Sequence, residues 1–148
     1  GDFNKGDFAN LSLNYYSFET NFVFTYYNEQ RGQDYNLVAG FNHNAENDVT
    51  NYKSGRELHL DFVFNHHLGE TLAIGLHGYV LRQISDDKKQ GAVLGGFESD
   101  AAGIGPALIW TPPQYRGDIS LSIKWLHDIH ADNRLKGDHL FLSLMLSL

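Results

Sequence analysis

The histidines and their neighbouring carboxylates are the side chains best suited to bind a metal ion or to move a proton. His59 and Asp61 stand two residues apart in an alternating segment, so both point to the same face of a strand. His77, on the next predicted strand, can join them. The group could be a metal site, a proton-linked gate or a hydrogen-bonded network. We favour the network, because buried polar groups usually find hydrogen-bond partners.

Other combinations of reactive residues predict no catalytic centre. His66 and His67 are adjacent and would point to opposite faces of a strand, which makes them a poor chelating pair. No Ser stands at alternate spacing from His127 or His130, so a Ser–His pair would need two separate strands. The chain has no Cys, which excludes a disulfide framework, a thiolate metal site and a Cys nucleophile. We therefore expect no enzyme, no cofactor and no resident metal.

Composition limits the class of protein and its partners. The 148 residues carry a net charge of −7 and no Lys/Arg cluster, which argues against a nucleic-acid partner. The 42% hydrophobic and 20% charged shares exclude wholesale disorder. No apolar run approaches the roughly 20 residues of a membrane helix. The length predicts one domain over residues 1–148, either complete or the C-terminal part of one.

The elements that must position these residues are strands, because apolar and polar residues alternate with a period of two. A helix would need apolar residues at three- and four-residue steps instead. No segment favours a helix. The predicted strands cover residues 16–27, 35–41, 57–65, 72–80, 103–110, 119–125 and 140–148. The sequence therefore predicts an all-β, antiparallel, up-and-down sheet of about seven strands.

The two faces of this sheet differ, and the question is which of them avoids water. In a soluble barrel the apolar face fills the core, whereas in a membrane barrel it contacts lipid and the polar face lines the lumen. The apolar face here is nearly uncharged, several strands reach nine residues, and aromatic residues gather near strand ends. These features favour a transmembrane β-barrel. The expected lumen-lining residues are Glu19, Asn21, His59, Asp61, His77, Tyr79 and Lys124.

The connections support the same interpretation. Residues 28–34, 66–70 and 111–118 form short connections, and residues 42–56, 85–102 and 127–139 form long polar ones. Short turns at one end and long loops at the other are typical of outer-membrane barrels. Such barrels have an even strand count, so at least one strand is expected beyond the seven, or within residues 1–14. We expect the chain to be the C-terminal part of a larger barrel whose remaining N-terminal strands complete it.

Several ordered stretches resemble one known family. They are Asn14-Tyr-Tyr-Ser-Phe-Glu19, Tyr52-Lys-Ser-Gly-Arg-Glu-Leu-His-Leu-Asp61, Gly75-Leu-His-Gly-Tyr79, Gly103-Ile-Gly-Pro106 and Ala131-Asp-Asn-Arg-Leu-Lys-Gly-Asp138. Together they resemble the C-terminal half of the outer-membrane β-barrel proteins associated with the meta-pathway of phenol degradation. The resemblance implies a barrel of about twelve strands in the outer membrane of a Gram-negative bacterium. It also implies passage of small, hydrophobic or aromatic molecules.

We therefore expect a channel for passive uptake, with outer-membrane lipid and small hydrophobic molecules as its partners. Two alternatives remain open at this point. One is a soluble β-barrel that binds a small apolar ligand with its leucine-rich face inward. The other is a lipid-modifying enzyme of the outer membrane.

Overall fold

The computed structural model describes residues 3–5, 12–115 and 118–147. Seven strands make up the fold: β1 (Ser17–Asn28), β2 (Gln33–Asn44), β3 (Glu57–His67), β4 (Leu72–Gln83), β5 (Asp100–Trp110), β6 (Ile119–Asp132) and β7 (Asp138–Leu146). Two single-turn 3₁₀ helices, η1 (Glu29–Arg31) and η2 (Pro113–Tyr115), lie in connections. Among the described residues, no helix is long and apolar enough to cross a membrane.

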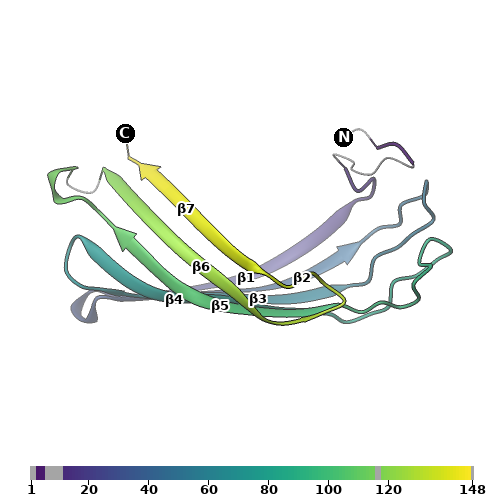
Figure 1. Cartoon of the computed structure of the whole chain (residues 1–148), viewed down its shortest axis with the longest axis horizontal. Coiled ribbons are helices and arrows are strands. Elements are labelled where there is room, and N and C mark those ends of the chain that lie inside the picture. The colour runs from purple at the N-terminus through teal and green to yellow at the C-terminus, as the bar shows by residue number, and fades with distance from the viewer. Residues whose placement is uncertain (1–2, 6–11, 116–117, 148) are drawn as a thin grey trace.

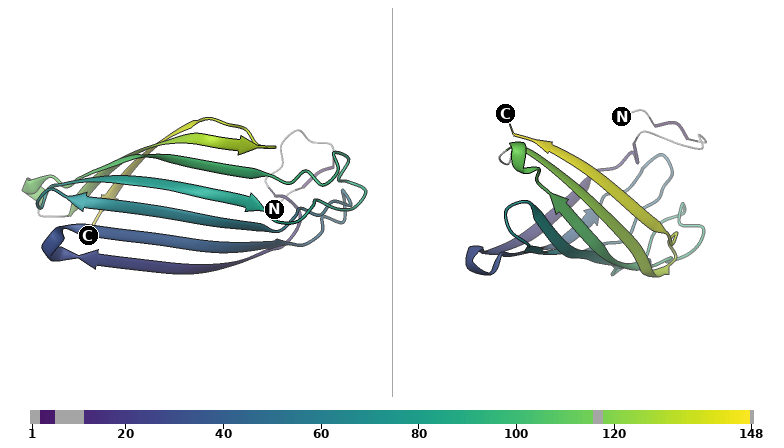
Figure 2. Two further views of the ribbon diagram at one scale, coloured as in Figure 1. Left: turned by 90° about the horizontal axis from the view of Figure 1, so that it is seen from below. Right: turned by 60° about the vertical axis from the view of Figure 1, so that its left-hand side comes forward.

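The strands form one sheet in which each strand pairs antiparallel with the next along the chain, from β1 to β7. The sheet bends into a trough, with β1 along one rim and β7 along the other (Figures 1 and 2). The predicted all-β antiparallel architecture is confirmed. The sheet of this chain is open rather than closed, because β1 and β7 do not pair with each other.

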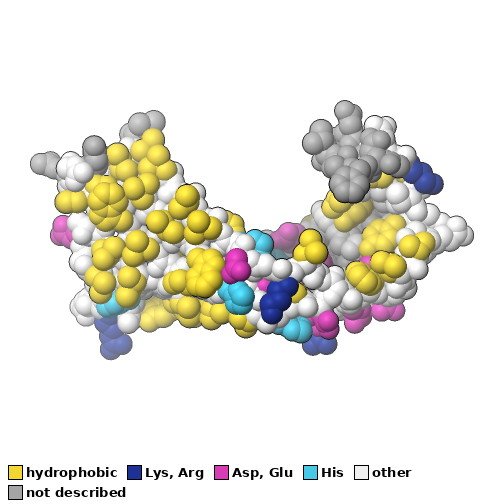
Figure 3. Space-filling view, in the orientation of Figure 1, with side chains coloured by type: hydrophobic (Ala, Val, Ile, Leu, Met, Phe, Trp, Pro, Cys, Tyr) yellow, Lys and Arg dark blue, Asp and Glu magenta, His cyan; other side chains and the backbone are white. Residues whose placement is uncertain are grey.

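The cross-strand register sorts the side chains onto two faces. We call the face that carries Glu19, His59, His77 and Lys124 the inner face and the opposite one the outer face. Every buried non-glycine residue of the strands lies on the inner face: Asn44, Ala73, His77, Gln83, Ala101, Ala107, Leu126 and Asp128. The outer face carries most of the exposed large apolar side chains of the strands, and Figure 3 shows many apolar side chains over the C-terminal strands. The molecule therefore buries small and polar groups and exposes leucines.

Most strands are longer than the sequence pattern predicted, and one predicted loop is wrong. Residues 127–139 were expected to form a long connection, but β6 continues to Asp132 and β7 begins at Asp138. The register between β5 and β6 shifts at Ala102/Gly103, so Ile129 is an extra residue in β6. A bulge of this kind inserts one residue and breaks the alternation, which hid the end of the strand. Leu148, expected in the last strand, lies outside the described residues.

Candidate functional site

All seven residues expected to line a lumen lie on the inner face, but they form two groups rather than one. Glu19 and Asn21 on β1 lie close to His59 and Asp61 on β3. The second group lies on β4 and β6. It contains His77, Tyr79 and Lys124. The cross-strand register places all of these side chains on one face, as the alternation predicts.

The first group is a hydrogen-bonded cluster centred on His59. Its Nδ1 lies 2.6 Å from Asp61 Oδ2, and its Nε2 lies 3.2 Å from Glu19 Oε1. Asn21 donates to the same Glu19 oxygen at 2.8 Å. Gly40 of β2 lies between Asn21 and His59 in the register, and a Cβ there would overlap the imidazole. The missing side chain at Gly40 thus lets the ring reach across one strand to β1.

His77 does not join this cluster, so that part of the sequence-based expectation is wrong. Its Nε2 lies 3.2 Å from the backbone oxygen of Trp125, two strands away. The strand between them carries Gly105 opposite His77, and a Cβ at Gly105 would overlap the same oxygen. His77 is therefore held against β6 over a gap that only glycine provides.

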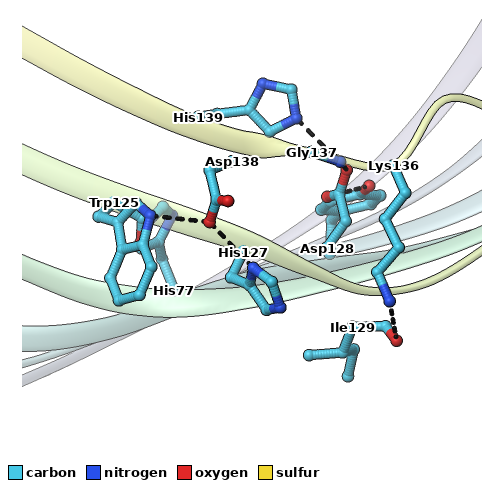
Figure 4. Close-up of polar contacts among 10 residues, drawn as sticks. His77, Trp125, His127, Asp128, Ile129, Lys136, Gly137, Asp138 and His139 are labelled. Carbon is cyan, nitrogen blue, oxygen red and sulfur yellow. Dashed lines mark hydrogen bonds and ion pairs between the residues drawn. The ribbon is translucent and has the colours of Figure 1, made fainter.

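Tyr79 reaches in the same way across β5 to Asp128, a residue that sequence reasoning missed. The Tyr79 hydroxyl donates to Asp128 Oδ1 at 2.8 Å, passing over Gly103. Asp128 is only 2% exposed, and its Oδ2 accepts from the Gly137 amide at 3.1 Å and lies 3.4 Å from His139 Nε2 (Figure 4). Asp128 stands four residues after Lys124, an even spacing that places both on the same face of a strand. The strand predicted from the sequence ended at residue 125, before Asp128.

A separate polar cluster of Trp125, His127 and Asp138 lies on the outer face of the β6–β7 hairpin. Asp138 Oδ1 accepts from Trp125 Nε1 at 3.1 Å and lies 2.9 Å from His127 Nδ1 (Figure 4). This is a His–Asp pair, but it has no Ser at its side, since Ser120 and Ser122 belong to the inner face. It therefore lacks the nucleophile that acyl transfer would require.

One pocket of about 300 Å³ opens on the inner face over β3 to β7. It is lined by Asp61, His77, Gly78, Tyr79, Lys124, Leu126, Phe141 and Ser143. No residue of β5 lines the pocket, because the inner face of that strand carries only the small residues Gly103, Gly105 and Ala107 here. A second hollow of the same size lies on the outer face between Tyr35, Phe64 and Ile74. The inner pocket is the candidate binding site, because it brings Asp61 of β3 and Lys124 of β6 together on the face that carries the polar clusters.

The two long connections at the end of the trough bind each other through Asp87. Its carboxylate accepts from the Tyr52 hydroxyl at 2.5 Å, the Gly55 amide at 2.9 Å and Gln83 Nε2 at 2.8 Å. An isolated bridge between Lys53 and Lys88 joins the same two loops. Three donors on one carboxylate make the loops a fixed structure at this end of the sheet.

The Asp87 contacts lead to a prediction about pH. Burial, followed by the bond to Asp87, raises the pKa of Tyr52 to about 12. Because this pKa is above the ordinary value of 10.0, the folded state holds the Tyr52 proton more tightly than the unfolded state does. The contribution of Tyr52 to the free energy of unfolding is therefore complete below pH 10 and is lost as the pH rises through about 12. We expect Asp87→Asn to lower the pKa of Tyr52 toward 10, measured by absorbance of the phenolate. Tyr52→Phe identifies the signal, and an unchanged pKa in Asp87→Asn would contradict the assignment.

The arrangement of the His, Asp and Glu side chains bears on metal binding. Within residues 3–5, 12–115 and 118–147, no group of three or more His, Asp or Glu side chains is arranged to hold a metal ion. The His59 cluster has two carboxylates on one imidazole, which fixes the ring but leaves no free nitrogen for a ligand. What the inner face offers is a surface of fixed polar groups around one pocket.

Comparison with known proteins gives one match. A family model described as "Putative MetA-pathway of phenol degradation" matches residues 1–144. No curated protein and no solved structure gives a significant match. Every lining residue of the inner pocket, from Asp61 to Ser143, lies within this range, so the match covers the whole candidate site.

Proposed function

The chain belongs to the family described as "Putative MetA-pathway of phenol degradation", and from this premise we propose that it forms part of an outer-membrane channel for small hydrophobic or aromatic molecules. The family links it to the breakdown of phenols, which must first enter the cell. The channel is a β-barrel in the bacterial outer membrane. Passage is passive, and no covalent step occurs on the protein.

The observation that carries this proposal is the exposure of the outer face. Leu142, Leu140 and Phe22 are 71%, 66% and 72% exposed, at positions that a soluble protein would cover. Tyr26, Tyr35 and Phe64 form a row of ring contacts across β1 to β3, at 5.8 and 5.5 Å between centroids. Lipid would cover the leucines, and the row of rings fits the headgroup level of a membrane.

The two open edges support completion by further strands. In a bilayer every backbone N–H and C=O must be bonded within the protein, so an open sheet edge is not tolerated there. β1 and β7 each have one unpaired side. We therefore propose that the remaining N-terminal strands of the same barrel pair with these edges and close the inner face into a lumen.

The lumen would let molecules pass along the inner face. Glu19, His59 and Asp61 set its polarity on one side, and Lys124 and Phe141 set it on the other. The hydrogen bonds around His59 hold Glu19 and Asp61 in place, and the pocket between Asp61 and Lys124 stays open. A solute would then move by partitioning between the pocket and the water at either end.

The proposal predicts that the protein needs an amphiphile to fold. In detergent-free buffer we expect aggregation, because the apolar outer face is uncovered. In detergent micelles or phospholipid vesicles we expect β-sheet circular dichroism and heat-dependent gel mobility, and in planar bilayers discrete conductance steps. A protein that stays monomeric and folded in plain buffer would contradict the proposal and favour the soluble, ligand-binding barrel.

A further inference from the structure

Lys124 is the one lining group of the inner pocket whose charge has no partner. It is half-buried on β6, and among the described residues it takes part in none of the ion pairs. Its cross-strand neighbours are Ala107 and Phe141, neither of which can accept a hydrogen bond from an ammonium through its side chain. An ammonium held among apolar neighbours loses hydration and favours an anion that can replace it.

The other polar lining groups are already engaged. Asp61 is bonded to His59, His77 to the oxygen of Trp125, and Tyr79 to Asp128. Asp61 lines the same pocket from β3, but among the described residues its carboxylate pairs with His59 and forms no ion pair with Lys124. The Lys124 ammonium is therefore the charged group of the pocket that is left to pair with an anionic ligand.

Apolar groups lie directly beside this charge. Phe141 pairs with Lys124 across the β6–β7 ladder, and Leu126 follows two residues later on the same face. Ser143, two residues beyond Phe141, adds a hydroxyl to the lining. A cavity of about 300 Å³ is at the small end of the range of about 300–1,000 Å³ for ligand pockets.

From this arrangement we propose that the inner pocket binds a small aromatic carboxylate, with its anionic end at Lys124 and its ring against Phe141 and Leu126. The Ser143 hydroxyl would donate a second hydrogen bond to the carboxylate. The inference deepens the proposed function, since it names the class of solute that the channel would prefer. It makes the favoured solute an apolar monoanion rather than a neutral hydrocarbon.

The test compares three probes of similar shape on the full chain in detergent: benzoate, benzyl alcohol and benzylammonium. Isothermal titration calorimetry should show benzoate binding more tightly than the other two. Lys124→Met should weaken benzoate binding about tenfold, because it removes a charge-assisted hydrogen bond, and should leave benzyl alcohol unchanged. Lys124→Arg should restore most of the preference. Lys88→Met, an exposed loop change, is the matched control and should change nothing.

Each outcome decides one point. Equal binding of benzoate and benzyl alcohol, or undiminished benzoate binding in Lys124→Met, would overturn the inference. Tighter binding of benzylammonium would assign the pocket to Asp61 instead and would also overturn it. These results leave the channel proposal intact, since conductance in planar bilayers is measured separately. A protein that binds benzoate but never inserts into a bilayer would refute the channel and keep the ligand class.

Discussion

Ile123→Arg should destabilise the protein in a lipid bilayer by about 2–4 kcal/mol, the cost of an arginine at the bilayer midplane on the lipid face of a barrel. Ile123 is 46% exposed on the outer face, inside β6 and away from either end of the strand. Few protein contacts are lost there, so the cost reports what surrounds the side chain. The measurement is urea unfolding of the protein reconstituted in phospholipid vesicles.

Ser122→Arg is the matched control for this change. Ser122 precedes Ile123 on the same strand and points to the inner face, opposite Ile109 and Ser143. Because the inner face would be wetted by the lumen, we expect an effect below about 1 kcal/mol. If both substitutions cost the same, the outer face does not contact lipid and the membrane proposal fails. If Ser122→Arg alone is destabilising, the two faces have been assigned the wrong way round.

Gly105→Ala should cost about 3 kcal/mol, the upper part of the usual range for forcing extra atoms into a packed site. A Cβ at this position would overlap the backbone oxygen of Trp125, and a backbone atom cannot turn aside as a side chain can. β5 and β6 would have to separate locally. His77, which crosses Gly105 to reach the same oxygen, would lose its partner.

Gly40→Ala is the comparison that isolates the backbone effect. The atoms that a Cβ would meet there belong to the side chains of His59 and Asn21, which can rotate away. We expect a much smaller loss than at Gly105, mainly that of the solvent-screened contact between His59 and Glu19. Both variants are measured by urea unfolding in vesicles. Equal losses would mean that the close approach of β5 and β6 is not what glycine permits.

The seven strands and their two faces could be predicted from the sequence because alternation is a local property. Leu140, Leu142 and Leu144 need only their neighbours in the chain to be placed on one face. The inner-face position of Glu19, His59 and Lys124 follows from the same parity, and the register agrees. The family, too, was recognisable from ordered short stretches, and the match over residues 1–144 confirms it.

The contacts between these side chains could not be predicted in the same way. Whether His77 meets Asp61 depends on which residues lie opposite in the ladder, and the ladder places Val63 opposite His77 and Tyr79 opposite Asp61. The bulge at Ile129 disturbed the alternation near the end of β6, so Asp128 was assigned to a loop. Register and bulges are set by pairing with distant segments, which a single-strand pattern does not contain.

Alternation along the chain is enough to predict an antiparallel sheet with one apolar and one polar face, because a strand's side chains alternate whatever the strand pairs with. The assembled sheet is needed to see that Gly40, Gly103 and Gly105 let side chains cross a whole strand to reach their partners. It also left Lys124 without a partner beside Phe141. These relations arise where three strands meet, and the sheet must be assembled before any of them exists.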